Sequence, residues 1–337
     1  MARAGARPSG TRAAEAPIEI GLNAAIVGVA DDQPQILIVR PHPEGKRPWD
    51  ALPFGPFTPL DHRTLEIGLR RWVKAQTGLE LGYVEQLYTF GDRGRHAQAG
   101  DIGPHVVSVG YLALTAAGAE PQFESANWSP WYVYLPWEDW RRGKPEILAE
   151  EIEPRLKRWA RLPADRRQPM RALNRHERLR VCFGIGGGAW DEEKVLERYE
   201  LLYGAGLVEE ASRDGREAAR AWDRPPALGR PMQFDHRRVL STAMGRLRGK
   251  LKYRPVIFEL IGPAFTLTEL QRMVEAIFGT HLHKQNFRRL VETAGLVEPT
   301  GDVRTQTGGR PAQLYRFRRD VLLERPAPGV RMRAVRG

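Results

Sequence analysis

Residues 265–294 read FTLTELQRMVEAIFGTHLHKQNFRRLVETA, and this stretch decides the fold of the C-terminal part of the chain. Thr266 and Glu269 have the spacing of a capping box, which predicts the start of a helix that the next glycine ends. A second helix is expected over residues 283–294, again closed by a glycine. Two short helices joined by a glycine-containing turn form the helix-turn-helix pattern.

The flanking sequence extends this pattern. A longer helix is expected upstream, over residues 235–252, and two β-prone segments follow, near Val297 and at 314–317. Gly308-Gly309 can form the tight turn of a hairpin between them. Residues 230–322 are therefore predicted to form a winged helix-turn-helix.

The second helix of the motif has an apolar and a polar face. Its apolar residues recur at helical spacing and should face the core: Phe287, Leu290, Val291 and Ala294. The candidate DNA-binding residues are Lys284, Gln285, Asn286, Arg288 and Arg289, with Arg304 and Arg310 from the hairpin. Arginine bonds guanine bidentately and glutamine can pair with adenine, as major-groove reading requires. The alternatives are a basic helix without a ligand and an RNA-binding surface, although no RRM-like or KH-like signature is present.

The charge distribution favours a polyanion partner. Residues 226–337 contain 21 lysines and arginines against 9 acidic residues, whereas residues 1–225 contain 31 against 32. The positive excess of the chain thus falls in its last third, as in proteins that bind nucleic acid. The alternative is a basic surface that serves solubility.

Residues 17–137 have an α+β pattern. Apolar runs at 20–30 and 35–40 flank a turn signal and predict a strand pair. An amphipathic helix is expected over residues 62–77, followed by β-rich runs at 83–90 and 105–115. Strands around one central helix indicate an α/β/α sandwich.

Residues 138–225 are charged, rich in arginine and mostly helical in pattern. Asp191 is expected to cap a helix that runs to Tyr203, and residues 213–230 are expected to form a linker. The run FGIGGG at 183–188 lacks the spacing and lysine of a phosphate-binding loop, so we interpret it as a flexible loop.

Several longer runs resemble a known family. RLRGKLKYRPVIFEL (246–260), HKQNFRR (283–289) and GGRPAQLYRF (308–317) are similar to Nudix-related transcriptional regulators, the NrtR-like repressors of NAD metabolism and their larger NadQ-type relatives. The resemblance implies a homodimer that binds a palindromic operator in double-stranded DNA and regulates genes of NAD synthesis or salvage. It also places Lys284, Asn286, Arg288 and Arg310 in the DNA-contacting elements. The long middle region favours the NadQ-like subtype.

The N-terminal region resembles a Nudix domain that has lost its metal ligands. LPFG at 52–55 stands where Leu-Pro-Gly-Gly is usual, and LRRWVKAQTGL at 69–79 stands at the Nudix box. The three box glutamates become Trp72, Ala75 and Gln76. Nudix hydrolysis needs carboxylates on one helix face to hold Mg²⁺. We therefore expect no enzyme, metal or cofactor; the alternative is a Mg-dependent Nudix nucleotide pyrophosphatase with a basic appendage.

The Nudix-like domain is expected to keep an effector pocket for ATP, ADP-ribose or an NAD-related nucleotide. Arginines offer cations for a diphosphate, and aromatic rings can stack on adenine. The candidate effector-binding residues are Arg40, Arg47, Arg71, Arg93, Trp49, Phe54, Tyr88 and Phe90. The alternative for each is a core aromatic ring or a solvated arginine.

The remaining composition indicates a cytoplasmic protein. The chain has one cysteine, Cys182, which excludes an internal disulfide and the usual cysteine-based zinc sites. Residues 1–17 lack the apolar core of a secretory signal and read as a basic arm. No apolar stretch approaches the length that spans a bilayer, so no membrane partner is expected.

Overall fold

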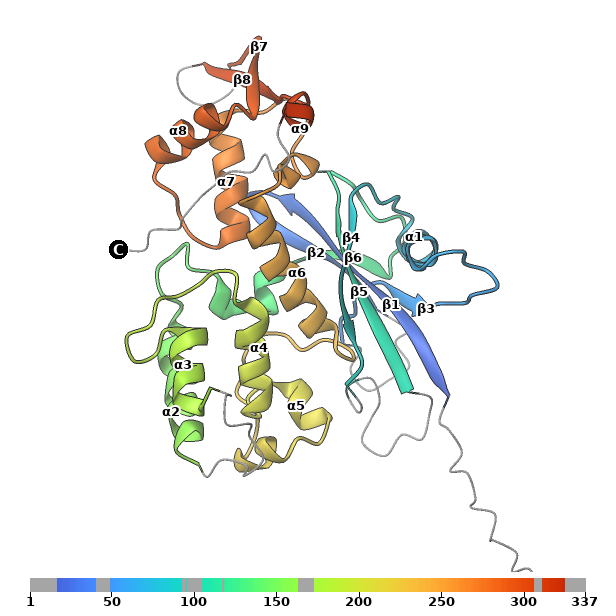
Figure 1. Cartoon of the computed structure of the whole chain (residues 1–337), viewed down its shortest axis with the longest axis vertical. Coiled ribbons are helices and arrows are strands. Elements are labelled where there is room, and N and C mark those ends of the chain that lie inside the picture. Colours follow the sequence, from blue (N-terminus) through green and yellow to red (C-terminus); the bar gives the residue numbers. More distant parts are fainter. Residues whose placement is uncertain are drawn as a thin grey trace, which may run out of the picture.

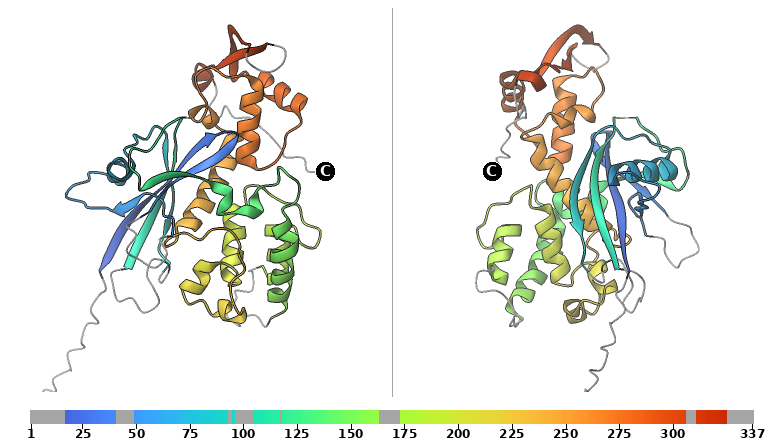
Figure 2. Two further views of the ribbon diagram at one scale, coloured as in Figure 1. Left: turned by 180° about the vertical axis from the view of Figure 1, so that it is seen from behind. Right: turned by 45° about the vertical axis from the view of Figure 1, so that its right-hand side comes forward.

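The computed structural model describes residues 17–40, 49–92, 95, 105–116, 118–162, 173–305 and 311–324. Figure 1 shows three parts: a sheet with a helix on its outer face, a helical bundle, and an end domain with a two-stranded hairpin. A long helix, α6 (His236–Leu251), runs between all three parts, as both views in Figure 2 also show. No helix among the described residues combines the length and apolarity needed to cross a membrane.

The sheet has six strands. They are β1 (Ile18–Ala30), β2 (Gln33–Val39), β3 (Phe54–Pro56), β4 (Val84–Phe90), β5 (His105–Leu114) and β6 (Ala126–Pro130). Their order is β4-β5-β1-β2-β6, with β3 paired to β1. The β1–β5 pair is parallel, and the other pairs are antiparallel.

The predicted strand pair at the start of the sheet is confirmed. Ala30 faces Gln33 across a two-residue turn, in which Asp31 and Asp32 have φ angles of 50° and 58°. Two successive positive φ angles match the twist of the flanking strands, and aspartate tolerates this conformation better than most residues.

Helix α1 (Leu65–Thr77) covers the outer face of the sheet. The Thr64 side chain accepts a hydrogen bond from the Ile67 amide, and Gly78 ends the helix with φ 74°. The helix was predicted from residue 62, but it begins after Thr64 because that hydroxyl caps its first turn. Leu69 and Val73 are fully buried against the sheet.

The inner face of the sheet is covered by α6. Alternate residues of β1 point to opposite faces, as pleating requires: Leu22, Ala24 and Ile26 pack with α1, and Ala25 and Val27 with the inner core. The predicted α/β/α arrangement is confirmed, but its third layer comes from residues 236–251. The sequence pattern predicted that these residues belong to the DNA-binding domain alone.

The middle region is a compact helical insert. Its elements are η1 (Trp131–Val133), η2 (Pro136–Glu138), η3 (Leu148–Ile152), α2 (Glu153–Arg161), α3 (Arg175–Phe183), α4 (Val195–Gly204), α5 (Glu209–Arg213) and η4 (Glu217–Ala221). Helix α4 begins at Val195, so the expectation that Asp191 caps it is wrong. The Asp191 carboxylate instead accepts a hydrogen bond from the Glu193 amide at 3.0 Å, in the turn before the helix.

The segment predicted as a linker, residues 213–230, is packed structure. Leu228 is 2% exposed, and the Trp222 indole nitrogen donates to the carbonyl of Ala205 at 2.9 Å. The high content of arginine and proline suggested a linker, but long-range contacts order the chain here.

The C-terminal elements follow the predicted order. They are η5 (Val256–Glu259), α7 (Leu267–Phe278), α8 (Lys284–Ala294), β7 (Val297–Arg304), β8 (Ala312–Phe317) and α9 (Val321–Glu324). The capping box is present: Thr266 accepts from the Glu269 amide, and Glu269 accepts from the Thr266 amide. Strands β7 and β8 pair antiparallel, while the turn predicted at Gly308-Gly309 lies outside the described residues.

Candidate functional site

Helix α8 separates its residues into a core face and a solvent face. Phe287 and Val291 are 1% and 0% exposed and fix the helix against the end domain. Gly295 ends the helix in the left-handed conformation, with φ 58°. The spacing of these apolar residues leaves the opposite face of α8 toward solvent, as the sequence predicted.

The solvent face carries the predicted DNA-binding side chains. Lys284, Gln285, Asn286, Arg288 and Arg289 are all exposed, and none of them forms an ion pair with another described residue. We call these five residues the α8 polar face. Five long donors at the start of a protruding helix can reach base edges and phosphates in a major groove.

Two arginines of the hairpin form ion pairs within the end domain. Arg304 pairs with Glu269, the glutamate of the α7 capping box, and the side chain of Arg304 remains 40% exposed. Arg316 pairs with Glu298 across the hairpin at 2.7 Å. Arg310 lies outside the described residues. In this structure Arg304 therefore holds the hairpin to α7.

Two arginines of the basic last third of the chain are buried in ion pairs. Arg237 and Arg248 on α6 are 1% and 0% exposed. Arg237 pairs with the buried carboxylate of Glu210. Arg248 pairs with the buried carboxylate of Glu138 at 2.8 Å. Burial disfavours the charged form, but these partners keep the pKa of both arginines above the ordinary value. Part of the positive excess of the last third is thus structural.

The three positions of the missing box glutamates lie on α1. The Gln76 side chain pairs with the backbone of Phe54: its nitrogen donates to the carbonyl at 2.6 Å, and its oxygen accepts from the amide at 3.0 Å. The Trp72 indole covers Gly55, where an added Cβ would lie 2.3 Å from the ring, and donates to the carbonyl of Pro56 at 2.8 Å. Neutral side chains therefore hold β3 at the face where a Nudix enzyme holds its metal.

Two exposed glutamates on or near α1 form separate surface ion pairs. Glu66 pairs with Arg70 within the helix, and Glu80, three residues after its end, pairs with Lys74. Among the described residues, no group of three or more histidines, cysteines and acids is arranged to hold a metal ion. The described residues on this face of α1 therefore supply no set of carboxylates that fits Mg²⁺.

The candidate effector residues that the structure describes do not converge on one place. Arg40 pairs with Asp50 at 2.9 Å, and Trp49 lies against Arg213. Arg71 and Tyr88 are exposed on α1 and β4, which belong to different parts of the sheet domain. The prediction that Phe90 binds the effector is wrong. Phe90 is 1% exposed and belongs to the core, so its ring is not accessible for stacking. Arg47 and Arg93 lie outside the described residues.

One of the predicted residues, Phe54, lines a cavity of about 180 Å³. The cavity lies between β1, β3, β5 and the segment before α6, and its aromatic wall is made by Phe54, Phe234 and His236. Phe234 and His236 are edge-on to Phe54, with ring centroids 5.5 and 5.2 Å away. Phe234 and His236 are absent from the predicted site residues, because no local pattern links them to Phe54, which is far away in the chain.

A charged network lies directly beside this wall. Asp235 is 2% exposed and pairs with Arg238 at 3.1 Å and Arg95 at 3.5 Å. Burial raises the pKa of Asp235 to about 6, against the opposing effect of the two arginines. Arg95 and Arg238 also bind Glu200 of the insert, at 2.9 and 2.6 Å, so the network joins the sheet loop, the insert and α6.

The glycine-rich run at 183–188 forms the turn after α3. Gly184 ends that helix with φ 70°, and Gly186 and Gly187 also have positive φ angles. These positions require glycine for the backbone path, which accounts for the motif without a phosphate.

Comparisons with known proteins agree with this architecture. Residues 257–317 match the family described as the NrtR DNA-binding winged helix domain. The ADPR responsive transcriptional repressor NtrR of Acinetobacter baylyi is 46% identical over 91 residues, which are 27% of this chain and 36% of that protein. The chain therefore aligns with just over a third of the length of this relative.

Two solved structures extend the similarity to nearly the whole chain. Shewanella oneidensis NrtR complexed with a 27mer DNA has a TM-score of 0.53 at 21% identity, over 90% of this chain and 94% of that one. A MutT/nudix family protein from Enterococcus faecalis has a TM-score of 0.51 at 15% identity, over 92% and 90% of the two chains. At these identities the likeness establishes the fold. The chain is therefore NrtR-like: a Nudix-like domain with a helical insert, followed by a winged helix domain of the NrtR type.

Proposed function

We propose that this protein is a transcriptional repressor that binds double-stranded operator DNA and regulates genes of NAD synthesis or salvage. The observation that carries the proposal is the α8 polar face, five exposed side chains that form no ion pair with a described residue, on the second helix of a winged helix domain. A homodimer would present two such helices to the halves of a palindromic operator. The relative from Acinetobacter baylyi, described as a transcriptional repressor, supports this assignment.

The DNA affinity would be controlled by an adenine nucleotide: ATP, ADP-ribose or an NAD-related nucleotide. The aromatic wall of Phe54, Phe234 and His236 suits a flat ring. The cavity of about 180 Å³ is smaller than the roughly 300–1,000 Å³ clefts that enclose whole drug-sized ligands. It would therefore take one part of a nucleotide and leave the rest at the surface. That the relative is described as ADPR responsive favours ADP-ribose as the first ligand to test.

Helix α6 would carry the effect of the ligand to the DNA-binding domain. His236, in its first turn, accepts a hydrogen bond from the Leu52 amide at 3.0 Å beside the cavity. Near its other end, Arg248 donates to the carbonyl of Ile277 in the last turn of α7 at 2.9 Å. A ligand that moves the start of α6 would thus reposition α7 and the helix that follows it. Allosteric coupling of this kind typically amounts to about 1–3 kcal/mol.

We further propose that the Nudix-like domain binds nucleotides without hydrolysing them. Trp72, Ala75 and Gln76 offer no carboxylate to a divalent ion, and two of them are bonded to the β3 segment. Incubation of the protein with ADP-ribose or NADH and Mg²⁺ should release no phosphate-containing product. Turnover at the rate of an active Nudix enzyme would favour the pyrophosphatase alternative instead.

The main test is a titration of the protein against its own upstream DNA, with and without ATP, ADP-ribose and NAD. Arg288→Ala should weaken specific binding by about 1–3 kcal/mol if Arg288 contacts a base. Arg63→Ala, an exposed arginine beside α1, is the matched control and should bind as the wild type does. Equal binding by Arg288→Ala and the wild type would contradict the role of the α8 polar face. A wild type with no preference for upstream DNA over unrelated duplex would contradict the proposed function.

A further inference from the structure

The insert contains a basic hollow that the proposed function does not use. It lies between α2 and α3, has a volume of about 530 Å³, and is bordered by Lys157, Arg161, His176 and Arg180. Each helix contributes two of these side chains, four residues apart. Residues at this spacing share a helix face, so each helix presents two nitrogen-bearing side chains to the same hollow, and three of the four are lysine or arginine. We call these four residues the insert basic groove.

The groove has little negative charge to balance it. Across α2 and α3 there are seven lysines and arginines and only two glutamates, Glu153 and Glu177. Glu177 also borders the groove, and its carboxylate accepts from the Asn174 amide at 2.7 Å at the start of α3. Glu153 is shared between Lys144 and Lys157. Like charges gathered on a surface repel one another, so such a groove favours an anion.

Two of its side chains differ from the other arginines of these helices. Arg155 pairs with Glu151, Arg158 lies over Trp222, and Arg175 and Arg178 lie over Trp159. Arg161 and Arg180 are exposed and have no such partner among the residues that the structure describes. Gly186 also borders the hollow, and no atom lies within 4 Å of the place a Cβ would take there, so the groove is open to an approaching backbone.

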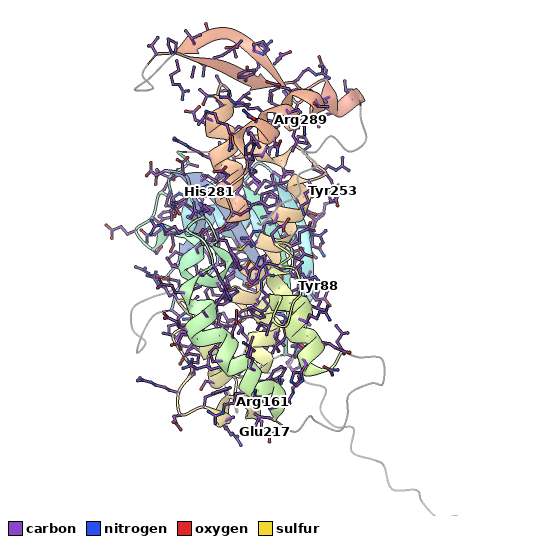
Figure 3. The ribbon with its side chains drawn as sticks, turned by 90° about the vertical axis from the view of Figure 1, so that its left-hand side faces the viewer. Tyr88, Arg161, Glu217, Tyr253, His281 and Arg289 are labelled. Carbon is purple, nitrogen blue, oxygen red and sulfur yellow. The ribbon has the colours of Figure 1, made fainter. Side chains whose placement is uncertain are left out.

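The insert basic groove lies on the same side of the molecule as α8. In Figure 1, α8 and the α2–α3 pair both project from the left edge, away from the sheet, and after a half turn in Figure 2 both project to the right. Figure 3 looks onto this side, with Arg289 toward one end of the molecule and Arg161 toward the other. A duplex bound at α8 and running along this side would pass the insert.

We propose that the insert basic groove binds the phosphate backbone of the DNA that flanks the segment read by α8. Arginine suits this role because its planar guanidinium bonds phosphate bidentately and stays charged at any physiological pH. Such contacts add affinity without sequence preference. The inference rests on the proposed function, since it needs DNA at α8, but it concerns a surface outside the winged helix domain.

The test compares Arg161→Ala/Arg180→Ala with the wild type on two duplexes, one that covers only the operator and one extended on both sides. The logarithm of the association constant falls linearly as the logarithm of salt concentration rises. Each lost phosphate contact reduces the steepness of this fall by about 1, so the double variant should reduce it by about 2 on the extended duplex. On the short duplex the two proteins should have equal slopes. Arg63→Ala/Lys74→Ala removes the same charge from the α1 side and should leave both slopes unchanged.

The outcomes separate the two proposals. If the wild type prefers its operator but the double variant keeps the wild-type slope on the extended duplex, the groove does not contact DNA and the proposed function stands. If the wild type shows no operator preference, the proposed function itself fails. A double variant that loses calorimetric binding of inorganic phosphate or ATP, yet keeps the wild-type slope, would assign the groove to a small phosphate ligand and overturn the DNA proposal. Both arginines are exposed, so the variant should fold, which circular dichroism can verify.

Discussion

Gln76 and Trp72 illustrate how single side chains change what the Nudix-like domain can do. At the residue scale, each takes a position where a metal-binding fold needs a carboxylate and uses it to hold β3 through the backbone of Phe54 or Pro56. The amide of Gln76 both donates and accepts, as the backbone of Phe54 requires. These two neutral side chains therefore hold the backbone of β3 against α1.

Restoring the acid should consequently harm the protein. Gln76→Glu replaces the donor by a second acceptor, which would face the carbonyl of Phe54. We expect the free energy of unfolding to fall by about 1–3 kcal/mol, the usual cost of a hydrogen-bonding group left without its partner. Urea denaturation measures this change. Gln313→Glu on the exposed side of β8 is the control and should be nearly neutral, and an equal loss in both variants would refute the explanation.

Asp235 should make stability depend on pH in an unusual direction. Burial raises its pKa to about 6, so between pH 4 and 6 the folded protein binds a proton that the unfolded chain has released. The contribution of Asp235 to stability is therefore largest at low pH and falls as pH rises toward 6. Asp235→Asn removes this contribution. We expect the free energy of unfolding of the variant, minus that of the wild type, to increase by about 1–3 kcal/mol from pH 4 to pH 7.

Asp92 provides a control of opposite sign. The hydrogen bond from Arg238 lowers the pKa of Asp92, so its contribution is present at neutral pH and is lost as pH falls. The ordinary pKa of aspartate is already about 4, so this loss occurs below pH 4, and Asp92→Asn should be less stable than wild type by nearly the same amount at pH 4 and pH 7. The two variants are compared by denaturant unfolding at both pH values. Parallel changes in both would show that the burial of Asp235 does not set its pKa.

At the scale of secondary-structure elements, the start of α7 joins three elements. Glu269 completes the capping box with Thr266 and also receives Arg304 from β7, so one carboxylate fixes the helix and the hairpin together. The backbone of Phe265 pairs with that of Tyr315 on β8 in both directions, at 3.0 and 2.8 Å. The position of the hairpin relative to α8 thus depends on how α7 begins.

Thr266→Ala tests this arrangement. Loss of the cap should lower the free energy of unfolding by about 0.5–2 kcal/mol. Because Thr266 is 6% exposed and adjoins the hairpin, the variant should also bind operator DNA less tightly. Thr64→Ala at the cap of α1 should cost similar stability but leave DNA binding unchanged. Unfolding and gel-shift titrations of both variants give the comparison, and a DNA defect in both would contradict it.

At the scale of the whole molecule, a buried ionic cluster connects the three parts. Glu138 of η2 binds Arg198 of α4 at 2.6 Å and Arg248 of α6 at 2.8 Å, and all three side chains are fully buried. Burial opposes ionisation of Glu138, but the two arginines lower its pKa below the ordinary value. Arg248 also reaches the last turn of α7. The insert is thereby attached to the same core as the DNA-binding domain.

Glu138→Gln should destabilise the whole protein. It leaves two buried guanidinium groups without a counter-charge, and breaking a buried ion pair in this way costs about 3–5 kcal/mol. Glu151→Gln, in a partly exposed pair with Arg155, should cost less than about 1 kcal/mol. Thermal unfolding followed by circular dichroism measures both. A small effect of Glu138→Gln would mean that the insert and α6 are not held together by this cluster.

The sequence alone determined the features that depend on neighbouring residues. The capping box of α7, the apolar spacing of α8 and the turn between β1 and β2 each involve positions close in the chain, and local patterns predicted all three. The replacement of the box glutamates was also readable, since it is a change of residue type at known positions. From these features follow the fold class and the candidate DNA-binding helix.

Only the tertiary structure decided which distant residues meet. The aromatic wall pairs Phe54 with Phe234 and His236, and the hydrogen bond from Leu52 to His236 spans 184 residues. Glu138 and Arg248 are 110 residues apart, so no local pattern separated this buried arginine from those on the surface. Periodicity and charge describe a residue and its neighbours, whereas burial depends on how the whole chain packs. For that reason the sequence pattern placed α6 in the DNA-binding domain alone, although this helix is also the inner layer of the sheet domain.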